Sequence, residues 1–572
     1  MRTKQILLAI AMLSCVAVQA QITLGSRRAV CDSLTGDWLC CVPQSTFGQD
    51  FETTLNLPAT WADITIDGDT VMAGTSYTFK QVSGERKYAL VAHQADSVTI
   101  SGNICFTFYP ILELTGTFTD DYQITDVIAN LPANQGPTTM FAKVKHRGGS
   151  TNTPDRLKRN YHIKFLNADS TKMDRKFFGL RNDNSWLLDA GQIDMLRIRN
   201  RVATELWADM GTRPYYADRE PKAMNYVRGD FVEMFLNGKY NGIYALTEAM
   251  DRKQLRLAKY DETDSVAPFH GMLWKTKAVD PVSRMFGATA YDNNSSMWGG
   301  VEVKYPDPDD VMPTDYKTLY DATDFVANGS NDDFRAHVGE YFDIPVMMDY
   351  YIFTNTVLAI DNGTKNIYWG VYDQQVDKKI TLAAWDLDCT FGQNWINNPL
   401  HNEDAVGPTH PMGLNNRLLI RLHELNPDSF AVKAVERFRM LRQTIFSNDS
   451  LKRRFAQRLQ PLFASGAIAR EQQRWTNTSD LSNNPLDFEA EMAYIEDWID
   501  RRMPYLDNKF FRPYIKGDSN RDGVIDITDI NRLISMMLIG DYPFWYEDMN
   551  DDDVVDISDI NAIINVLLGK NQ

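Results

Sequence analysis

Six residues in the middle of the chain, DNGTKN, place a carboxylate at Asp361 and a carboxamide at Asn366. A second acidic group follows in WDLDCTFG, where Asp386 and Asp388 come directly after an apolar run. Phosphoryl transfer uses such groups: one Asp orients the substrate hydroxyl, and an Asn and a further Asp hold a divalent metal against the phosphates. The Asn-Gly pair also predicts a tight turn, so a turn alone is the simpler interpretation of the first stretch.

A strand lysine upstream suits the same chemistry. HRGGST is a glycine-containing loop, and NYHIKF after it reads as a strand that carries Lys164. A lysine in this position can neutralise nucleotide phosphates, and Glu205 on the next predicted helix is a candidate partner for it. The alternatives are a strand lysine whose stem covers apolar surface and an ordinary exposed helix carboxylate.

Two acidic stretches near the C-terminus, DSNRDGVIDITD from Asp518 and DMNDDDVVDISD from Asp548, form an internal repeat. Each precedes an apolar helical run and has the spacing of a calcium loop, with a backbone carbonyl at position seven. The alternative is two acidic turns on a solvated surface. The predicted ligands are Asp518, Asn520, Asp522, Val524, Asp526 and Asp529 in the first loop, and Asp548, Asn550, Asp552, Val554, Asp556 and Asp559 in the second.

Position six of a calcium loop needs a sharp turn, which glycine adopts freely and aspartate only at some cost. The first loop has Gly523 at this position and the second has Asp553. We therefore expect two calcium sites, of which the second binds more weakly.

The elements that must position these groups predict an α+β protein. Residues 21–110 alternate in the manner of strands and predict a small β-rich region. Strands and helices mix from 111 onward, residues 258–315 are polar and read as an insertion, and 415–511 are mostly amphipathic helix. The run GDFVEMFLNGKYNGIYALTEAMDR predicts a hairpin whose two apolar strands are separated by NGKYNG.

The N-terminus predicts export. Residues 1–20 begin with a short basic region, continue with an apolar one and end with small residues, which is the order found in a signal peptide. Cys15 lies in a poor lipoprotein context, so we expect simple secretion, or release to the cell surface or periplasm, rather than lipidation. An oxidising compartment makes a disulfide from Cys31 to Cys40 or Cys41 plausible. No later stretch is apolar enough to predict a membrane span, and a net charge of −17 argues against nucleic-acid binding.

An ordered series of blocks resembles the CotH (spore coat protein H) kinase family from about residue 112 to 511. The blocks are RGGST through YHIKF, WLLDAGQIDMLRIRNRVATELWADMG, VEMFLNGKYNGIYALTEAMDR, DNGTKNIYWG and WDLDCTFG. The paired calcium loops resemble a dockerin, which has Asp at position twelve and lacks an incoming helix. These resemblances divide the chain into a kinase-like domain over 111–511 and a dockerin-like module over 515–572.

The first resemblance implies a bilobal protein kinase-like fold that uses ATP with Mg²⁺ or Mn²⁺ to phosphorylate Ser of secreted proteins. It makes Asp361 the catalytic Asp and Asn366 and Asp386 metal ligands, with Asp388 as the alternative to Asp386. Lys164 becomes a phosphate contact with Glu205 as its partner, and ALTEAMDR becomes the segment that joins the lobes. Two further residues are phosphate-facing candidates, Arg147 and Lys158. WDLD departs from the usual DFG, and no His-Arg precedes Asp361.

The dockerin resemblance implies a cohesin-like partner that contacts the surface around Ile527, Thr528, Ile557 and Ser558. It also leaves two other classes of function open. One is a non-catalytic surface adhesin or scaffold protein, which the scarcity of ATP outside the cytoplasm favours. The other is a carbohydrate-active component of a polysaccharide-degrading assembly, which needs two carboxylates about 5–10 Å apart.

Overall fold

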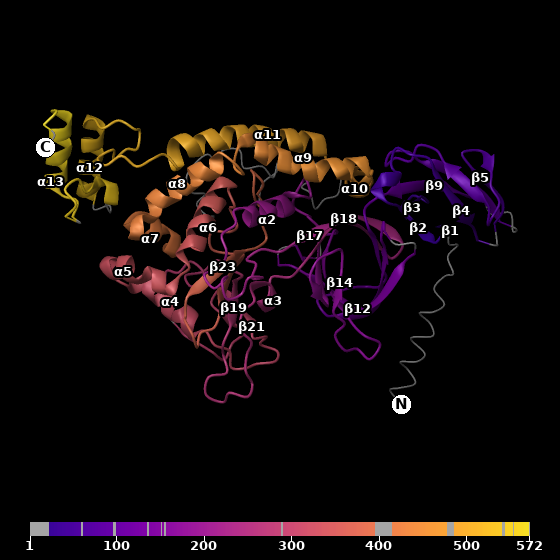
Figure 1. The fold of residues 1–572 in the computed structure, drawn as a ribbon, viewed down its shortest axis with the longest axis horizontal. Coiled ribbons are helices and arrows are strands. Elements are labelled where there is room, and N and C mark those ends of the chain that lie inside the picture. Colours follow the sequence, from indigo (N-terminus) through magenta and orange to yellow (C-terminus); the bar gives the residue numbers. More distant parts are fainter. Residues whose placement is uncertain are drawn as a thin grey trace. The chain divides into compact units, whose positions relative to one another are not determined.

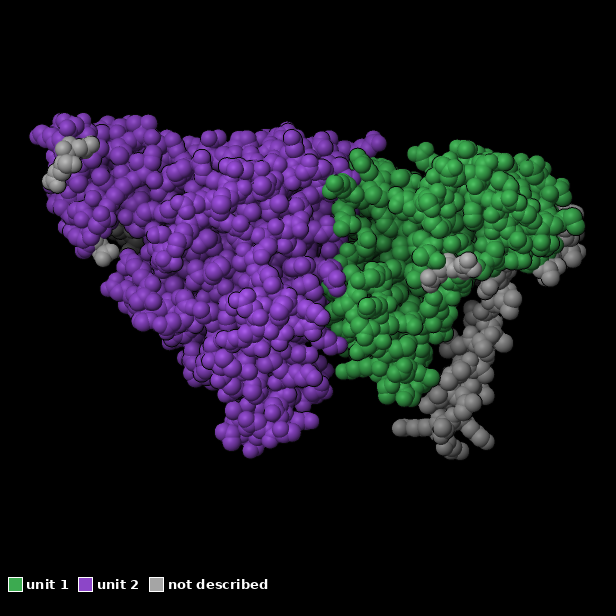
Figure 2. Space-filling model, in the orientation of Figure 1, with its two compact units in different colours: residues 1–197, 229–248, 457–488 green, residues 198–228, 249–456, 489–572 purple. Residues whose placement is uncertain are grey.

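The computed structural model shows two compact units, each assembled from separate stretches of chain (Figure 2). Unit 1 contains residues 1–197, 229–248 and 457–488, and unit 2 contains 198–228, 249–456 and 489–572. The structure describes residues 22–58, 61–94, 99–133, 136–149, 151–153, 156–287, 290–394, 415–476, 485–539, 544–552 and 554–570. The predicted signal peptide and Asp553 lie outside the described residues.

Unit 1 begins with a nine-stranded sheet in the order β6-β5-β8-β9-β3-β2-β1-β4-β7 (Figure 1). Its alternating sequence buries one cluster that includes Trp38, Phe79 and Phe106. The strands are β1 (Ile22–Leu24), β2 (Arg27–Cys31), β3 (Trp38–Cys41), β4 (Phe51–Asn56), β5 (Trp61–Ile66), β6 (Asp69–Thr70), β7 (Ser76–Phe79), β8 (Tyr88–Gln94) and β9 (Thr99–Thr107).

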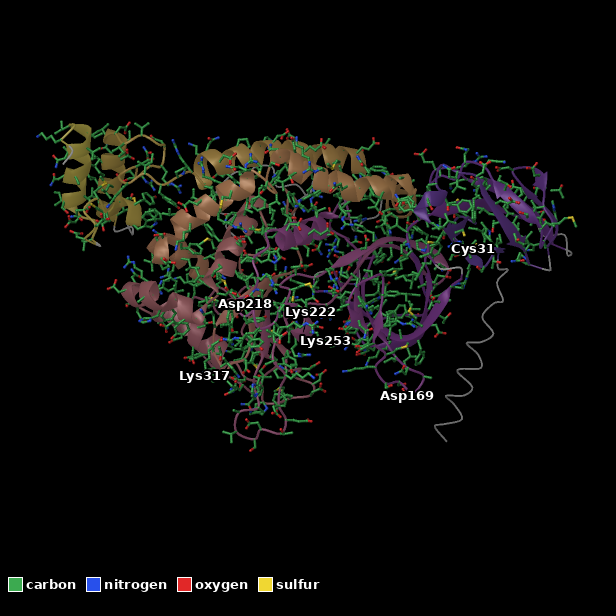
Figure 3. The ribbon with its side chains drawn as sticks, in the orientation of Figure 1. Cys31, Asp169, Asp218, Lys222, Lys253 and Lys317 are labelled. Atoms are coloured by element: carbon green, nitrogen blue, oxygen red, sulfur yellow. The ribbon has the colours of Figure 1, made fainter. Side chains whose placement is uncertain are left out.

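The disulfide predicted within this sheet is wrong, because all five described cysteines are free thiols. Cys31, labelled in Figure 3, lies opposite Trp38 in the β2–β3 register rather than opposite Cys40 or Cys41. Cys40 and Cys41 are neighbours on β3 and therefore point to opposite faces of the sheet. The Cys41 thiol instead donates a hydrogen bond to the Tyr109 carbonyl at 3.0 Å.

A closed barrel, in the order β10-β11-β12-β13-β16-β18-β17, follows in unit 1. Inward side chains from every strand fill it, including Val144, Ile163 and Trp186. The barrel strands are β10 (Ile111–Leu114), β11 (Gln123–Asn130), β12 (Thr138–Arg147), β13 (Asn160–Phe165), β16 (Ser185–Asp189), β17 (Gly229–Leu236) and β18 (Lys239–Thr247). A separate two-stranded sheet pairs β14 (Arg175–Lys176) with β15 (Asn182–Asp183).

Helix α10 (Ala467–Trp475) packs on β18 and completes unit 1. Its Glu471, with no exposed surface, accepts hydrogen bonds from Lys158 Nζ and Arg197 Nε at 2.8 Å each. The other carboxylate oxygen accepts the Ile243 amide at 2.8 Å. A buried carboxylate with cationic and backbone donors is satisfied, so Glu471 joins the helix to the barrel.

Unit 2 is built on a five-stranded sheet in the order β20-β21-β19-β22-β23. Its strands are β19 (Met272–Thr276), β20 (Met297–Trp298), β21 (Val301–Tyr305), β22 (Ile367–Val371) and β23 (Ile380–Ala384). Described helices of this unit are α2 (Arg199–Asp209), α3 (Arg252–Leu255), α4 (Lys317–Asn328), α5 (Asn331–Tyr341), α6 (Ile344–Thr356), α7 (Arg417–Leu425) and α8 (Phe430–Arg442). Two long helices, α9 (Asn448–Ala464) and α11 (Phe488–Tyr505), each contain residues of both units.

The segment predicted as an insertion, 258–315, supplies three strands of this sheet. Strand β19 pairs with β21 on one side and β22 on the other, and its Trp274 is fully buried. Part of the segment is therefore integral to unit 2. Its high polarity comes from the loops between the strands, which hid the short strand signals in the sequence.

The C-terminal repeat forms two helices, α12 (Ile527–Ile539) and α13 (Ile557–Leu567), each preceded by one acidic loop. A small core of Ile530, Leu533, Ile560 and Ile563 joins them. The coarse prediction of a mixed α+β protein is thus confirmed. Among the described residues, no helix is both long and apolar enough to cross a membrane.

Candidate functional site

The hairpin β22–β23 brings the two predicted acidic stretches to one end of the sheet. Ile367 pairs with Ala384 in the antiparallel register, so DNGTKN enters β22 where WDLD leaves β23. Residues about 20 positions apart therefore become neighbours. The chain thus runs from the DNGTKN loop through the hairpin to an Asp of WDLD. A kinase-like site needs the same order, a catalytic loop followed by a metal-binding Asp.

Asn362, in the middle of the predicted turn, fastens these two stretches together. Its side chain is fully buried and donates from Nδ2 to the Trp385 carbonyl at 2.7 Å. Its own carbonyl accepts a hydrogen bond from the Tyr350 hydroxyl on α6. The turn is thus anchored on both sides, and the sequence alone gave no sign that its Asn faces inward.

Asp361 and Asn366 contact each other directly. The Asn366 Nδ2 atom donates to Asp361 Oδ2 at 2.8 Å, and Lys365 Nζ lies 3.1 Å from the same oxygen. Burial raises the pKa of the Asp361 carboxyl; the Lys365 ammonium opposes this shift, and the charge of Asp386 adds to it. Asp361 is therefore a carboxylate whose charge depends on its immediate neighbours.

Asp386 lies two residues beyond β23, with an exposed side chain and a left-handed backbone at φ 60°. Its charge acts on both Asp361 and Lys365. Asp388 is half-buried and hydrogen-bonds the Cys389 thiol instead. Of the two acids, Asp386 is the one whose charge acts on Asp361.

The predicted Mg²⁺ or Mn²⁺ ligands, Asp386 and Asn366, suit the ion chemically, since a carboxylate and an amide supply the hard oxygen donors it prefers. Donation from Nδ2 to Asp361 also turns the Asn366 amide oxygen away from that carboxylate. Asn366 and Asp386 would hold the ion, which would neutralise phosphate charge when bound. Within the described ranges, no group of three or more His, Cys, Asp or Glu side chains is arranged to hold a metal.

Lys164 lies on the outer face of the barrel, because its neighbours Ile163 and Phe165 point into the core. Its ammonium is 5.2 Å from the centre of the Tyr122 ring, and those of Lys143 and Lys145 are each 4.8 Å from it. This lysine cluster was missed in the sequence, although the alternation AKVKHR indicates that Lys143 and Lys145 share a face.

The other residues predicted to contact the nucleotide have neighbours of their own. Lys158 is fully buried against Glu471, and burial lowers its pKa to about 8 despite that carboxylate. Arg147 ends β12 opposite Asn160. Glu205 on α2 lies 3.5 Å from Arg201 Nη2. Lys164 belongs to unit 1 and Glu205 to unit 2, so their pairing stays a prediction.

The two acidic C-terminal loops repeat the same contacts. Asp529 and Asp559, at position twelve, have no exposed surface, and each accepts backbone amides from position three and position nine of its own loop. Gly523 has φ +90°, as expected for position six. Carboxylates suit a calcium ion chemically, but no group of three or more acidic, His or Cys side chains in the described part of these loops is arranged to hold a metal. The comparison of Gly523 with Asp553 involves a residue outside the described ones.

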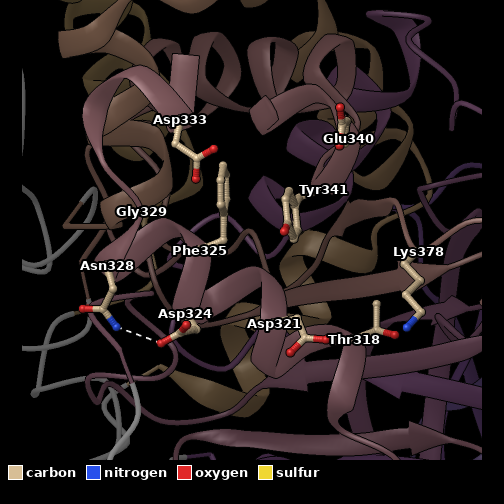
Figure 4. A pocket seen from close by; sticks show the side chains of 10 residues that line it. All are labelled: Thr318, Asp321, Asp324, Phe325, Asn328, Gly329, Asp333, Glu340, Tyr341 and Lys378. Carbon is tan, nitrogen blue, oxygen red and sulfur yellow. Dashed lines mark hydrogen bonds between the residues drawn. The ribbon is translucent and has the colours of Figure 1, made fainter. Parts of the chain in front are cut away.

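A hollow of about 580 Å³ on α4 and α5 lies apart from these groups (Figure 4). Four carboxylates line it, from Asp321, Asp324, Asp333 and Glu340, and the rings of Phe325 and Tyr341 stack 4.2 Å apart at its edge. None of the predicted site residues lines it. Its volume alone therefore does not identify a reaction site.

Comparison with known proteins gives one family. The model described as CotH kinase protein matches residues 144–506, a span that includes Asp361, Asn366 and Asp386 but not the C-terminal repeat. No curated protein matches the chain. Because the family match covers more than half of the sequence, the chain belongs to the CotH kinase protein family.

Proposed function

We propose that the chain is a secreted atypical protein kinase that transfers the γ-phosphate of ATP to serine in extracellular proteins. Its family supports kinase chemistry with ATP and a divalent metal. The observation that carries the proposal is the convergence of Asp361, Asn366 and Asp386 at one end of the β22–β23 hairpin. The predicted signal peptide supports action outside the cytoplasm.

In this proposal Asp361 orients the serine hydroxyl and takes up its proton. The serine oxygen attacks the γ-phosphorus, its bond to phosphorus forms, and the bond from phosphorus to the β,γ-bridging oxygen breaks to release ADP. Asn366 positions Asp361 through its amide hydrogen bond and, with Asp386, holds the metal. Anchoring by Asn362 keeps these groups in register, as positioned catalysis requires.

A bilobal arrangement is the finer part of the proposal. Two compact units support it, and the boundary between Glu248 and Ala249 falls inside ALTEAMDR, the predicted connection between lobes. Lys164 and Glu205, with Arg147, remain the proposed phosphate-side residues. Lys158 would have to leave its buried ion pair to contact a phosphate, so it has the weakest support among them.

The test is transfer from labelled ATP, with Mn²⁺ or Mg²⁺, to the protein itself or to a serine-rich peptide. Asp361→Ala should abolish labelling, a loss of at least about 100-fold, because the hydroxyl then lacks its base and orienting group. Asp428→Ala, at an exposed carboxylate on the same unit, is the control and should label normally. Equal labelling by wild type and Asp361→Ala would reject the role of Asp361, whereas absence of labelling by wild type would favour the non-catalytic adhesin or scaffold.

The C-terminal repeat supports a second function, calcium-dependent docking to a cohesin-like partner. Exposed apolar residues recur at an offset of 30 positions and give the two halves matching surfaces. Single exposed apolar residues are ordinary, and it is their recurrence at equivalent positions of both halves that supports the proposal. The pairs are Val524 with Val554, Ile527 with Ile557, Ile534 with Ile564, Met537 with Leu567, and Leu538 with Leu568.

Docking predicts that a cohesin domain binds the full chain in calcium and is released by a chelator. Asp529→Ala should abolish the tighter calcium site seen by calorimetry, and Asp559→Ala the weaker one, because each removes a buried ligand. The paired change Ile527→Asp with Ile557→Asp should prevent docking without altering calcium binding. Cohesin binding that does not depend on calcium would count against the dockerin-like module. It would also remove the support that this module gives to a role in a polysaccharide-degrading assembly.

A further inference from the structure

Lys365 pairs with the Asp361 carboxylate of the candidate site. Its ammonium lies 3.1 Å from Asp361 Oδ2, and this is its only hydrogen bond among the described residues. The charge of Asp386 also acts on it. About a third of the side chain is exposed, so the ammonium has a route to solvent.

The backbone around Lys365 is fixed independently of its side chain. Asn362 is held through its side chain and its carbonyl, and the Asn366 amide donates to the Thr276 carbonyl at 3.1 Å. A lysine stem has four rotatable bonds and can swing from such an anchored loop. Removal of the ammonium should therefore leave the loop in place.

We propose that Lys365 is a resident counter-ion that makes the site prefer the metal–nucleotide complex to the bare metal ion. A divalent ion that arrives alone meets an ammonium already paired with Asp361, and like charges at such distances repel strongly in a partly buried site. A metal that arrives on a triphosphate brings net negative charge, toward which the ammonium can turn. This inference rests on the proposed kinase function.

The experiment measures two affinities in one full-length background, Asp529→Ala with Asp559→Ala, so that the C-terminal loops do not bind the probe. Calorimetry with Mn²⁺ alone and with Mn²⁺–ATP compares Lys365 with Lys365→Met, Lys365→Arg and the exposed-lysine control Lys433→Met. The methionine variant should bind bare Mn²⁺ about three- to tenfold more tightly and Mn²⁺–ATP about tenfold more weakly. The arginine variant, which keeps the charge, and the control should stay within about twofold of wild type.

Equal or weaker Mn²⁺ binding by Lys365→Met overturns the inference, and so does a change of the same sign in both affinities. Thermal melting of each variant excludes general unfolding, and Lys365→Arg must retain the wild-type ratio. If wild type transfers label but Lys365→Met does not change the two affinities in opposite directions, only the role of Lys365 is overturned. Absence of both labelling and Mn²⁺–ATP binding overturns the proposed function itself.

Discussion

At the scale of single residues, the candidate site stores backbone strain. Asn366 has φ 58° and Asp386 has φ 60°, and Leu358 at the start of the same loop has φ 51°. A non-glycine residue in this region costs about 1–2 kcal/mol, less for Asn and Asp. The surrounding hydrogen bonds overcome this cost, which is the pattern expected where a chain holds catalytic groups in fixed positions.

Residue types and spacing made Asp361, Asn366 and Asp386 candidates, because phosphoryl transfer limits which side chains can serve, and their roles stay predictions. They were not enough to select Lys365 or the buried Asn362. The roles of these two depend on which way each side chain points out of a turn. Only the pairing of β22 with β23 and the contact with Trp385 decide that direction.

A comparison of Asp386→Ala with Asp388→Ala tests the choice between the two acids of WDLD. The first should lower transfer by at least about 100-fold, because it removes a metal ligand. The second should leave transfer within about fivefold, since Asp388 bonds Cys389. Steady-state labelling rates at several Mn²⁺ concentrations check this, and the reverse ranking would make Asp388 the ligand.

At the scale of elements, the hairpin β17–β18 shows which parts of a turn the local sequence pattern predicts correctly and which it does not. NGKYNG was predicted to separate the strands, yet the turn uses only its first Asn-Gly pair, and β18 already begins at Lys239. The second glycine, Gly242, lies inside β18 with φ +105°. A Cβ there would come within 2.1 Å of Glu471 Oε2, a constraint set by a helix more than 200 residues away.

Gly242→Ala should therefore destabilise unit 1 by about 3 kcal/mol, from backbone strain together with overpacking against Glu471. Gly238→Ala is the matched control, because its φ is +70° and no atom lies within 4 Å of the added methyl group. It should cost only about 1–2 kcal/mol of strain. Urea unfolding of both variants measures the difference, and equal losses would show that Glu471 yields to the methyl group.

At the scale of the whole molecule, the α+β class and the family followed from local blocks, whereas the division into units did not. Lys158 and Glu471 are 313 positions apart, and no spacing rule links them. Their contact exists because α10, from the helical C-terminal half, belongs to the barrel unit. Periodicity identifies such a helix but does not say which sheet it covers.

Within unit 2, a buried histidine joins helix α7 to the C-terminal segment. This contact predicts that the stability of the protein depends on pH. His423 on α7 bonds the Tyr514 hydroxyl at 2.8 Å and stacks on Tyr351; burial, assisted by Arg521, lowers its pKa to about 4. An unfolded histidine titrates near 6.5, so stability is intact above that pH and is lost as the pH falls toward 4. The loss should approach about 3 kcal/mol.

Urea unfolding at pH 7 and pH 4.5 measures this loss, and His423→Gln should remove most of it because glutamine does not titrate. His337→Gln is the control, since His337 lies exposed on α5. A wild-type pH slope that survives in His423→Gln would assign the effect to other groups.

The division of unit 1 into three stretches has a consequence for the order in which the protein can be made. Residues 457–488 leave the ribosome, or an export channel, only after most of the chain has emerged. Until then Lys158 and Arg197 lack the carboxylate that neutralises them in the finished barrel. A chain that stops before residue 457 therefore carries two cations without their counter-ion. Unit 1 is completed late, after the residues of the DNGTKN loop have already been synthesised.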